Sequence, residues 1–235
     1  MLPVTNTIHI KINDHIDHEE YAEALAELEK LPDSLQKKST VDRLKVDQKC
    51  LESTGQKLFE QIASGRSMIG ICHQNTREGE IFKRIVLNTI GTLLTKSLGQ
   101  KLIQKILLSN IPVIIYPYLK FRTTPSDLFS KLKKSFLLGF DPDFSKKKFL
   151  QDRTSRLFLR LPPCIGLVHE LCHVNDGIDG TMQLNFSYDP KHTMEEMYAI
   201  TGKVNYKGHS YLPYNIYNEN AFRQLFRIPD RTSYE

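Results

Sequence analysis

Long apolar runs are missing from this 235-residue sequence. The longest apolar stretches, Ile103–Leu108 and Ile111–Tyr118, are interrupted by polar residues. A transmembrane helix needs about 20 consecutive apolar residues, so both stretches are far too short. The first residues also lack the charged segment and the following apolar segment of a Sec-type signal peptide. We therefore expect no membrane anchor and no export through the general secretory route.

Cysteines in the spacing of a disulfide framework are absent as well. The four that occur are far apart and irregularly spaced, and none forms a CxxC pair: Cys50, Cys72, Cys164 and Cys172. We expect them to be free thiols, which suits a reducing compartment. We expect Cys172, between the two histidines of the motif described below, to serve in packing.

The excess of basic over acidic residues is modest. There are 32 Lys and Arg against 27 Asp and Glu, which gives a formal net charge of +5. Nucleic-acid-binding domains concentrate basic side chains on one face. The densest basic runs here, 131–134 and 146–148, are typical of solvated helix faces, with attraction of an acidic partner surface as the alternative. We expect neither nucleic acid nor a membrane as a partner.

Composition and periodicity predict a folded chain rich in helices. Hydrophobic residues make up 40% of the chain and charged residues 25%, an ordinary globular mixture that can bury a core. Residues 7–12 have a strand-like pattern in an N-terminal stretch that otherwise favours no fold. We further expect helices at residues 19–31, 41–62 and 80–108 with Gly91 and Gly99 as candidate breaks, strands at 68–72 and 111–116, and a partly helical segment at 123–151.

One motif carries chemistry: His169-Glu170-Leu171-Cys172-His173, the HExxH pattern. Its spacing places both imidazoles on one face of a helix, one turn apart, so that they can hold one ion. Two neutral imidazoles suit Zn²⁺ and leave room for a third ligand and a water molecule. Glu170 lies beside the metal and can accept a proton from that water, as a general base does. Pro163 suits the first turn of this helix, and Gly177 is its expected end.

The third ligand must come from elsewhere in the chain. Glu195 and Glu196, on a helix expected at 193–201, follow the motif at a distance typical of peptidases with a glutamate ligand on the next helix. Glu219, at the start of a helix expected at 218–226, is the other candidate. We favour Glu196, because its helix is nearer in sequence, and the choice among the three stays open.

Further polar residues could support such a site. Asp176, one turn after His173, could accept the free ring hydrogen of a ligand and fix its tautomer. A donor for the tetrahedral oxyanion could come from a group of residues near the C-terminus: His209, Tyr211, Tyr214 and Tyr217. For each of these four, packing or a surface position is the more common role.

The last third of the chain, from Pro162 to Tyr234, resembles the NleD-type effector zinc metallopeptidases. Three separated motifs carry the resemblance, in the order found in that group. They are Pro163-Cys164-Ile165-Gly166-Leu167-Val168 leading into HELCH, Glu195-Glu196-Met197-Tyr198-Ala199-Ile200, and Asn218-Glu219-Asn220-Ala221-Phe222-Arg223 continuing to residues 229–234. The cysteine at position 172 replaces the apolar residue that is more usual there.

The resemblance implies a bacterial effector that a type III secretion apparatus injects into the cytoplasm of a host cell. It implies a zinc endopeptidase that cleaves a host signalling protein, with stress-activated MAP kinases, cut in the activation loop, as the first expectation. One alternative is the same chemistry on another host target, such as a transcription factor of inflammatory signalling. The other is a non-catalytic module that keeps zinc structurally or not at all, against which an intact Glu170 argues.

We therefore expect an α+β, zincin-like metallopeptidase fold, with a small twisted sheet packed on the HExxH helix. Residues 1–18 are predicted to be a flexible N-terminal secretion segment, and residues 19–235 to form one zinc metallopeptidase domain. An extended substrate segment would pair with the edge of the sheet above the zinc.

Overall fold

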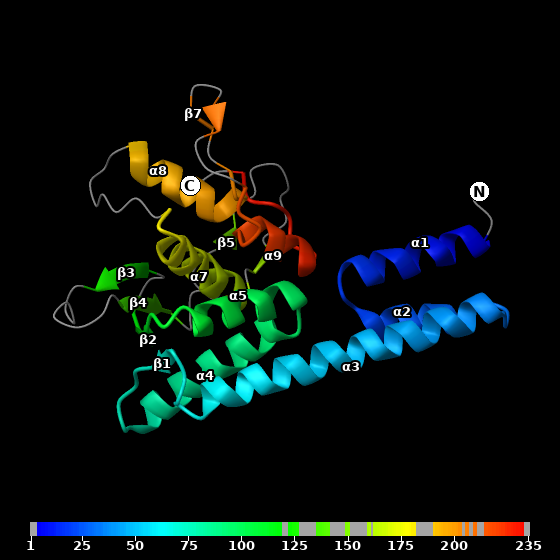
Figure 1. Ribbon diagram of the computed structural model, residues 1–235, viewed down its shortest axis with the longest axis horizontal. Coiled ribbons are helices and arrows are strands. Elements are labelled where there is room, and N and C mark those ends of the chain that lie inside the picture. The colour runs from blue at the N-terminus through cyan, green and yellow to red at the C-terminus, as the bar shows by residue number, and fades with distance from the viewer. Residues whose placement is uncertain are drawn as a thin grey trace.

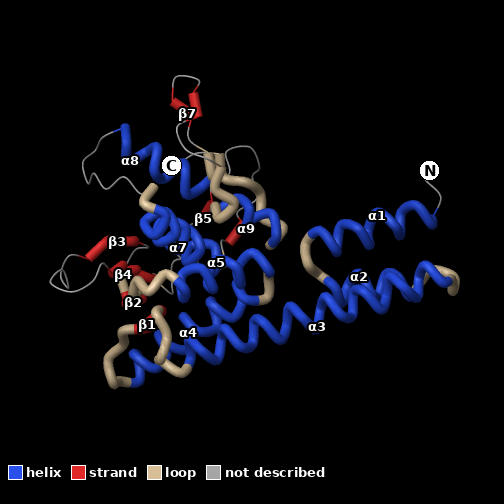
Figure 2. The backbone as a smooth tube through the Cα atoms, in the orientation of Figure 1, coloured by secondary structure: helices blue, strands red, loops and turns tan. Residues whose placement is uncertain are grey.

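The computed structural model describes residues 4–118, 122–126, 135–141, 149–150, 159–160, 162–181, 190–203, 205–206, 209–210 and 214–232. These residues form helices and small β-sheets, and the predicted α+β class is confirmed at that level (Figures 1 and 2). No helix among the described residues has both the length and the apolar character needed to cross a membrane.

The N-terminal part is a helical arm built from α1 (Val4–Asp17), α2 (Tyr21–Glu29) and the first half of α3 (Leu35–Ala63). Figure 1 shows α2 lying along α3 and α1 packed on α2, with this arm projecting from the rest of the molecule. A small core of its own holds the arm together: Ile12, Ala24, Leu28 and Leu44 are buried, and Ile8 and Ile16 pack against them. The helix predicted at residues 19–31 is confirmed as α2, and that at 41–62 is part of the longer α3.

The strand-like segment predicted at residues 7–12 is wrong, because these residues belong to α1. Alternating isoleucines suggested a period of two. In the structure, Ile8, Ile12 and Ile16 recur every four residues and face the arm's core, whereas Ile10 is 58% exposed. The residues therefore have defined helical structure, and their role as a secretion segment stays a prediction.

Two helices pack against α3 and against each other, α4 (Arg77–Leu94) and α5 (Ser97–Leu108). They confirm the helical pattern predicted at residues 80–108, and the break falls between them. Gly91 lies inside α4. Gly99 lies in the first turn of α5, where an added Cβ would come 2.1 Å from the Leu93 carbonyl oxygen. Glycine at position 99 therefore allows the two helices to meet closely.

The main sheet has the strand order β1-β2-β4-β3. Its strands are β1 (Ile69–Ile71), β2 (Val113–Pro117), β4 (Ser135–Phe140) and β3 (Arg122–Ser126). The first three are parallel, and β3 runs antiparallel to β4 at one edge. The strands predicted at residues 68–72 and 111–116 are thus confirmed. The remaining short strands pair in twos: β5 (Phe149–Leu150) with β6 (Leu159–Arg160), and β7 (Asn205–Tyr206) with β8 (His209–Ser210).

In the segment predicted to be partly helical, residues 123–151, the described residues form strands, apart from Asp141. Ser-Phe-Leu-Leu-Gly-Phe at 135–140 is almost entirely buried as β4. A strand buried on both faces has a continuous apolar run, which periodicity alone does not distinguish from a buried helix. Residues 127–134, 142–148 and 151 lie outside the described residues.

The HExxH segment lies on α7 (Pro163–Asp179), which is buried over most of its length. Helix α7 packs against α4, α5, β3 and β4, and on its other side against α8 (Pro190–Thr201) and α9 (Glu219–Leu225). Pro163 occupies the first turn, as predicted. The predicted end at Gly177 is wrong: the helix continues to Asp179, and Gly180 ends it in the left-handed conformation with a φ of 72°.

Candidate metal centre

Helix α7 brings the two motif histidines together. The ring centroids of His169 and His173 are 4.8 Å apart, and the rings are nearly perpendicular at 88°. Their Nε2 atoms approach to 3.3 Å. His173 is buried, and the His169 side chain is 13% exposed. The predicted arrangement of two imidazoles on one helix face, one turn apart, is confirmed.

Helix α8 adds one carboxylate to the same point. Glu196 Oε2 lies 3.0 Å from His169 Nε2, and Glu196 Oε1 lies 3.5 Å from His173 Nε2. One ligand atom from each of the three side chains falls within 4.8 Å of the others, so this group could hold a metal ion. Of the three glutamates considered from the sequence, Glu196 is the one that faces both Nε2 atoms.

Glu219, on α9, lies on the other side of His169. Its Oε2 accepts a hydrogen bond of 2.9 Å from His169 Nδ1, the ring nitrogen opposite the one that faces Glu196. Its Oε1 accepts a bond of 2.6 Å from Arg223 Nε, and Arg231 approaches Oε2 at 3.4 Å. The side chain of Glu219 is only 2% exposed. Glu219 therefore orients His169, a role that carboxylates commonly have beside metal-binding histidines.

Glu195 is placed near the Nδ1 atom of the second histidine. Its Oε1 lies 3.8 Å from His173 Nδ1, longer than a hydrogen bond. The Nδ1 atom of His173 is buried and makes no hydrogen bond within the described part of the chain. The two adjacent glutamates of α8 thus approach different ring nitrogens of His173, Glu196 at Nε2 and Glu195 at Nδ1.

Asp176 does not make the hydrogen bond to a motif histidine that the sequence suggested. Its Oδ1 accepts a hydrogen bond of 2.7 Å from Asn215 Nδ2, and its Oδ2 is buried with no hydrogen-bond partner among the described residues. Burial raises the pKa of this carboxyl group to about 7. Asp176 therefore ties α7 to the segment before α9. The hydrogen bond to a motif histidine, which the sequence suggested for Asp176, is made by Glu219.

The electrostatics of the cluster follow from opposite charges in a buried space. Burial alone would lower the pKa of His169, but the hydrogen bonds with Glu196 and Glu219 outweigh it and raise that pKa to about 10. Burial would raise the pKa of Glu219, but His169 and the charge of Arg223 lower it to about 2. Burial would also raise the pKa of Glu196, but its hydrogen bonds with His169 and His173 lower it. In the metal-free protein the cluster therefore holds a proton on His169, which a bound cation would displace.

Two further residues of the motif are buried in α7. Glu170, the predicted base, is 5% exposed and contributes a negative charge that helps raise the pKa values of His169 and His173. Cys172 is fully buried, and burial raises the pKa of its thiol well above the usual value. A neutral thiol in the core fits the packing role expected for Cys172.

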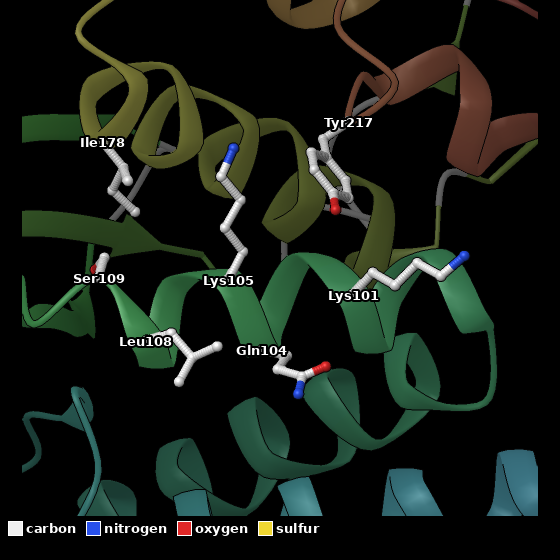
Figure 3. Close-up of a pocket in the computed structure, with 7 residues that line it drawn as sticks. All are labelled: Lys101, Gln104, Lys105, Leu108, Ser109, Ile178 and Tyr217. Atoms are coloured by element: carbon white, nitrogen blue, oxygen red, sulfur yellow. The ribbon is translucent and has the colours of Figure 1, made fainter.

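The predicted oxyanion donors are only partly within the described structure. The side chains of His209 and Tyr211 lie outside the described residues. Tyr214 is 56% exposed, and its hydroxyl accepts a hydrogen bond of 3.4 Å from Asn218. Tyr217 lies against α5, with Lys105 Nζ 5.3 Å from its ring centroid. Figure 3 shows Tyr217 at a shallow groove lined by Lys101, Gln104, Lys105, Leu108, Ser109 and Ile178, none of them a residue of the metal cluster.

Arg223 is a part of the site that sequence reasoning did not identify. It is 3% exposed, and its guanidinium joins Glu219 to the Pro229 carbonyl oxygen at 2.9 Å. Glu219 and Arg223 are four residues apart on one helix, the spacing at which opposite charges pair. That spacing was available as a signal in the sequence.

The fold and the site together define an α+β protein with a buried group of two histidines and one glutamate that could bind a metal ion. Comparison with models of protein families, with curated proteins and with solved structures finds no match for this chain.

Proposed function

We propose that the chain is a zinc-dependent endopeptidase in which His169, His173 and Glu196 hold the metal and Glu170 is the general base. The observation that carries the proposal is the convergence of the two Nε2 atoms and one carboxylate, supplied by α7 and α8, at one buried point. Glu170 follows His169 on the same helix, the position that the HExxH pattern gives to the base.

The donor set fits Zn²⁺. Two imidazole nitrogens and a carboxylate oxygen are ligands that zinc accepts at catalytic sites, where a fourth position stays open. The two Nε2 atoms lie 3.3 Å apart, so both imidazoles could hold the same cation once His169 has lost its extra proton. Glu219 supports this arrangement, because a hydrogen bond at Nδ1 leaves Nε2 of His169 as the free ligand atom.

When bound, zinc would polarise the carbonyl group of a substrate and lower the pKa of water at the site. Glu170 accepts the proton of the attacking water and returns it to the leaving amine, which balances the proton across the reaction. Its burial keeps the carboxylate in a medium where bulk water does not compete for that proton. His169 and His173 stay neutral while they act as ligands, which requires His169 to give up its proton first.

The arrangement of the sheet supports a zincin-like fold and a site for an extended substrate. Strand β3 is antiparallel to its neighbour β4 and lies at the edge of the sheet, and it packs against α7. Its outer edge pairs with no other described strand. An extended peptide could add to that edge beside the HExxH helix, with its backbone hydrogen-bonded to β3. Selectivity would then come from ordering a flexible segment rather than from a deep pocket.

For the biological role we propose a bacterial effector peptidase, delivered by a type III secretion apparatus into the cytoplasm of a host cell. The order of the three sequence motifs between Pro162 and Tyr234 supports this. The proposed substrates are stress-activated MAP kinases, cleaved in the activation loop. Another host signalling protein, such as an inflammatory transcription factor, is the alternative that the same chemistry allows.

The test is cleavage by the purified protein. We expect it to cut a stress-activated MAP kinase in the presence of zinc, and we expect Glu170→Ala, with its zinc retained, to be inactive. Mapping of new N-termini in a host-cell lysate identifies another substrate if the kinase stays intact. Zinc binding with no new N-terminus in either experiment would favour the non-catalytic module. Cleavage that survives both Glu170→Ala and a chelator would refute the mechanism.

A further inference from the structure

Two helix ends meet where the arm returns to the body of the molecule. Helix α1 ends at Asp17, and α9 ends at Leu225. Figure 1 shows the loop after α1 beside the end of α9. No buried hydrophobic cluster spans this contact among the described residues, because the arm and the body have separate cores. Apart from the continuous helix α3, polar side chains make the connection.

Both helix ends close in the same unusual way. After α1, Glu20 N donates to the His15 carbonyl oxygen and Glu19 N donates to that of Ile16. After α9, Ile228 N donates to the Arg223 carbonyl oxygen and Arg227 N donates to that of Gln224, in the same pattern. This is the Schellman motif, in which the left-handed residue is usually glycine. Here those positions are Glu19 and Arg227, each with a φ of 55°.

The side chains at these two positions cross the contact. Arg227 donates from Nε and Nη2 to the two carboxylate oxygens of Glu20, at 2.9 and 2.8 Å, and from Nη1 to Asp14 Oδ2 at 2.9 Å. Glu19 accepts a hydrogen bond of 2.6 Å from the Ser97 backbone amide at the start of α5, and another from the Ser97 hydroxyl.

A buried lysine completes the contact. Lys96 is 8% exposed, and its Nζ donates to the His18 carbonyl oxygen at 2.5 Å while lying 5.7 Å from the Phe226 ring centroid. Helices α1 and α2 form a helical hairpin. We call the group that ties it to the body the hairpin clamp: Asp14, Glu19, Glu20, Lys96, Ser97 and Arg227. Of the three non-glycine residues with positive φ in the described part of the chain, two belong to it. Such a conformation persists where surrounding contacts hold it.

The clamp acts on the helix that carries Glu219. Helix α9 has seven residues, about two turns, which is too short to be stable in isolation, so its position depends on its contacts with the rest of the fold. At its first residue, Glu219 contacts His169, and two residues beyond its last lies Arg227. We propose that the loop between α1 and α2 is a positioning element of the metal centre. It fixes the end of α9 through Arg227 and so keeps Glu219 in place against His169.

This inference rests on the proposed zinc site for one of its two measurements only. The first is hydrogen exchange of the α9 amides by mass spectrometry in the metal-free protein. The second is zinc affinity, measured by competition with a chromophoric chelator. The variants are Arg227→Gln, which removes the charge, and Arg227→Lys, which keeps it. Glu27→Gln is the matched control, because Glu27 pairs at 2.6 Å with Lys30 on the same hairpin, and no hydrogen bond or ion pair of Glu27 to the body is found among the described contacts.

We expect Arg227→Gln to speed exchange in α9 and to weaken zinc binding about threefold to tenfold. Loss of a carboxylate bonded directly to a ligand costs more, roughly tenfold to a hundredfold. Arg227→Lys should recover part of both effects, and Glu27→Gln should match the wild type. If Arg227→Gln leaves α9 exchange and zinc affinity unchanged, the inference is overturned. If the wild type binds no zinc, the proposed function fails, and α9 exchange still decides whether the clamp holds the helix.

Discussion

Replacing Glu219 by Gln removes one charge from a buried chain of three groups. Glu219 accepts from His169 Nδ1 through one oxygen and from Arg223 Nε through the other. A glutamine has one acceptor oxygen and one donor amide, so one of the two partners would face another donor. Because Arg223 is 3% exposed, water cannot replace the lost acceptor without opening the structure. The substitution therefore leaves a buried cation without its counter-charge.

The size of this effect can be estimated from the site. Burial would raise the pKa of Glu219, but its partners lower it from 4.5 to about 2; at about 1.4 kcal/mol per unit, the charged form is favoured by roughly 3–4 kcal/mol net of burial. Breaking one partner of a buried ion pair costs a similar amount, about 3–5 kcal/mol. We expect Glu219→Gln to lower the free energy of unfolding of the metal-free protein by about 3 kcal/mol, and its zinc affinity roughly tenfold to a hundredfold.

Urea unfolding measures the change in the free energy of unfolding, and competition with a chelator measures the change in zinc affinity. The control is Glu80→Gln, because Glu80 pairs with His73 Nε2 at the same distance, 2.9 Å, but is 60% exposed. An exposed pair contributes about 0–1 kcal/mol, so this control should stay close to wild type. If Glu219→Gln were no more destabilising than Glu80→Gln and bound zinc equally well, the assignment of Glu219 as the support of His169 would be refuted.

The other predictions concern pH and packing. The pKa of His169 is raised from 6.5 to about 10 in the folded state, so its contribution to stability is complete below pH 6.5 and is lost as pH rises through 10. Urea unfolding of the metal-free protein should show this decline, and a His169→Gln variant should show a flatter profile. Gly99→Ala should destabilise by roughly 1–3 kcal/mol, because the new Cβ meets the Leu93 carbonyl oxygen at 2.1 Å. Gly91→Ala, whose Cβ meets Phe59 at 3.6 Å, should be neutral or stabilising by up to about 1 kcal/mol; thermal melts of both variants measure the difference. Equal effects of the two alanines would contradict the packing argument.

The spacing of residues close together in the sequence correctly predicted those features that depend on a single helix or strand. The i, i+4 histidines, Pro163 at the helix start and the strand predicted at 111–116 each follow from a short stretch of sequence. Glu196 and Glu219 could not be separated in this way, because the choice depends on which ring nitrogen each carboxylate reaches across the fold. The sequence shows how far apart the helices are along the chain, and their packing decides which atoms meet.

Two departures from the predicted secondary structure have one physical origin. Isoleucines at residues 8–12 and the apolar run at 135–140 each fit a helix and a strand. In the first case the choice depends on a partner surface, the core of the arm, toward which every fourth residue turns. In the second it depends on the neighbouring strands β2 and β3, which pair with both edges of β4. Contacts distant in sequence therefore decided both outcomes.

Native mass spectrometry of the protein dialysed against zinc tests the central claim most directly. The account predicts one zinc ion bound per chain in the wild type. It predicts weakened or lost binding when Glu196, which faces both Nε2 atoms, is replaced by Gln. A wild-type chain that binds no zinc would contradict the account, as would a Glu196→Gln variant that binds zinc as tightly as the wild type.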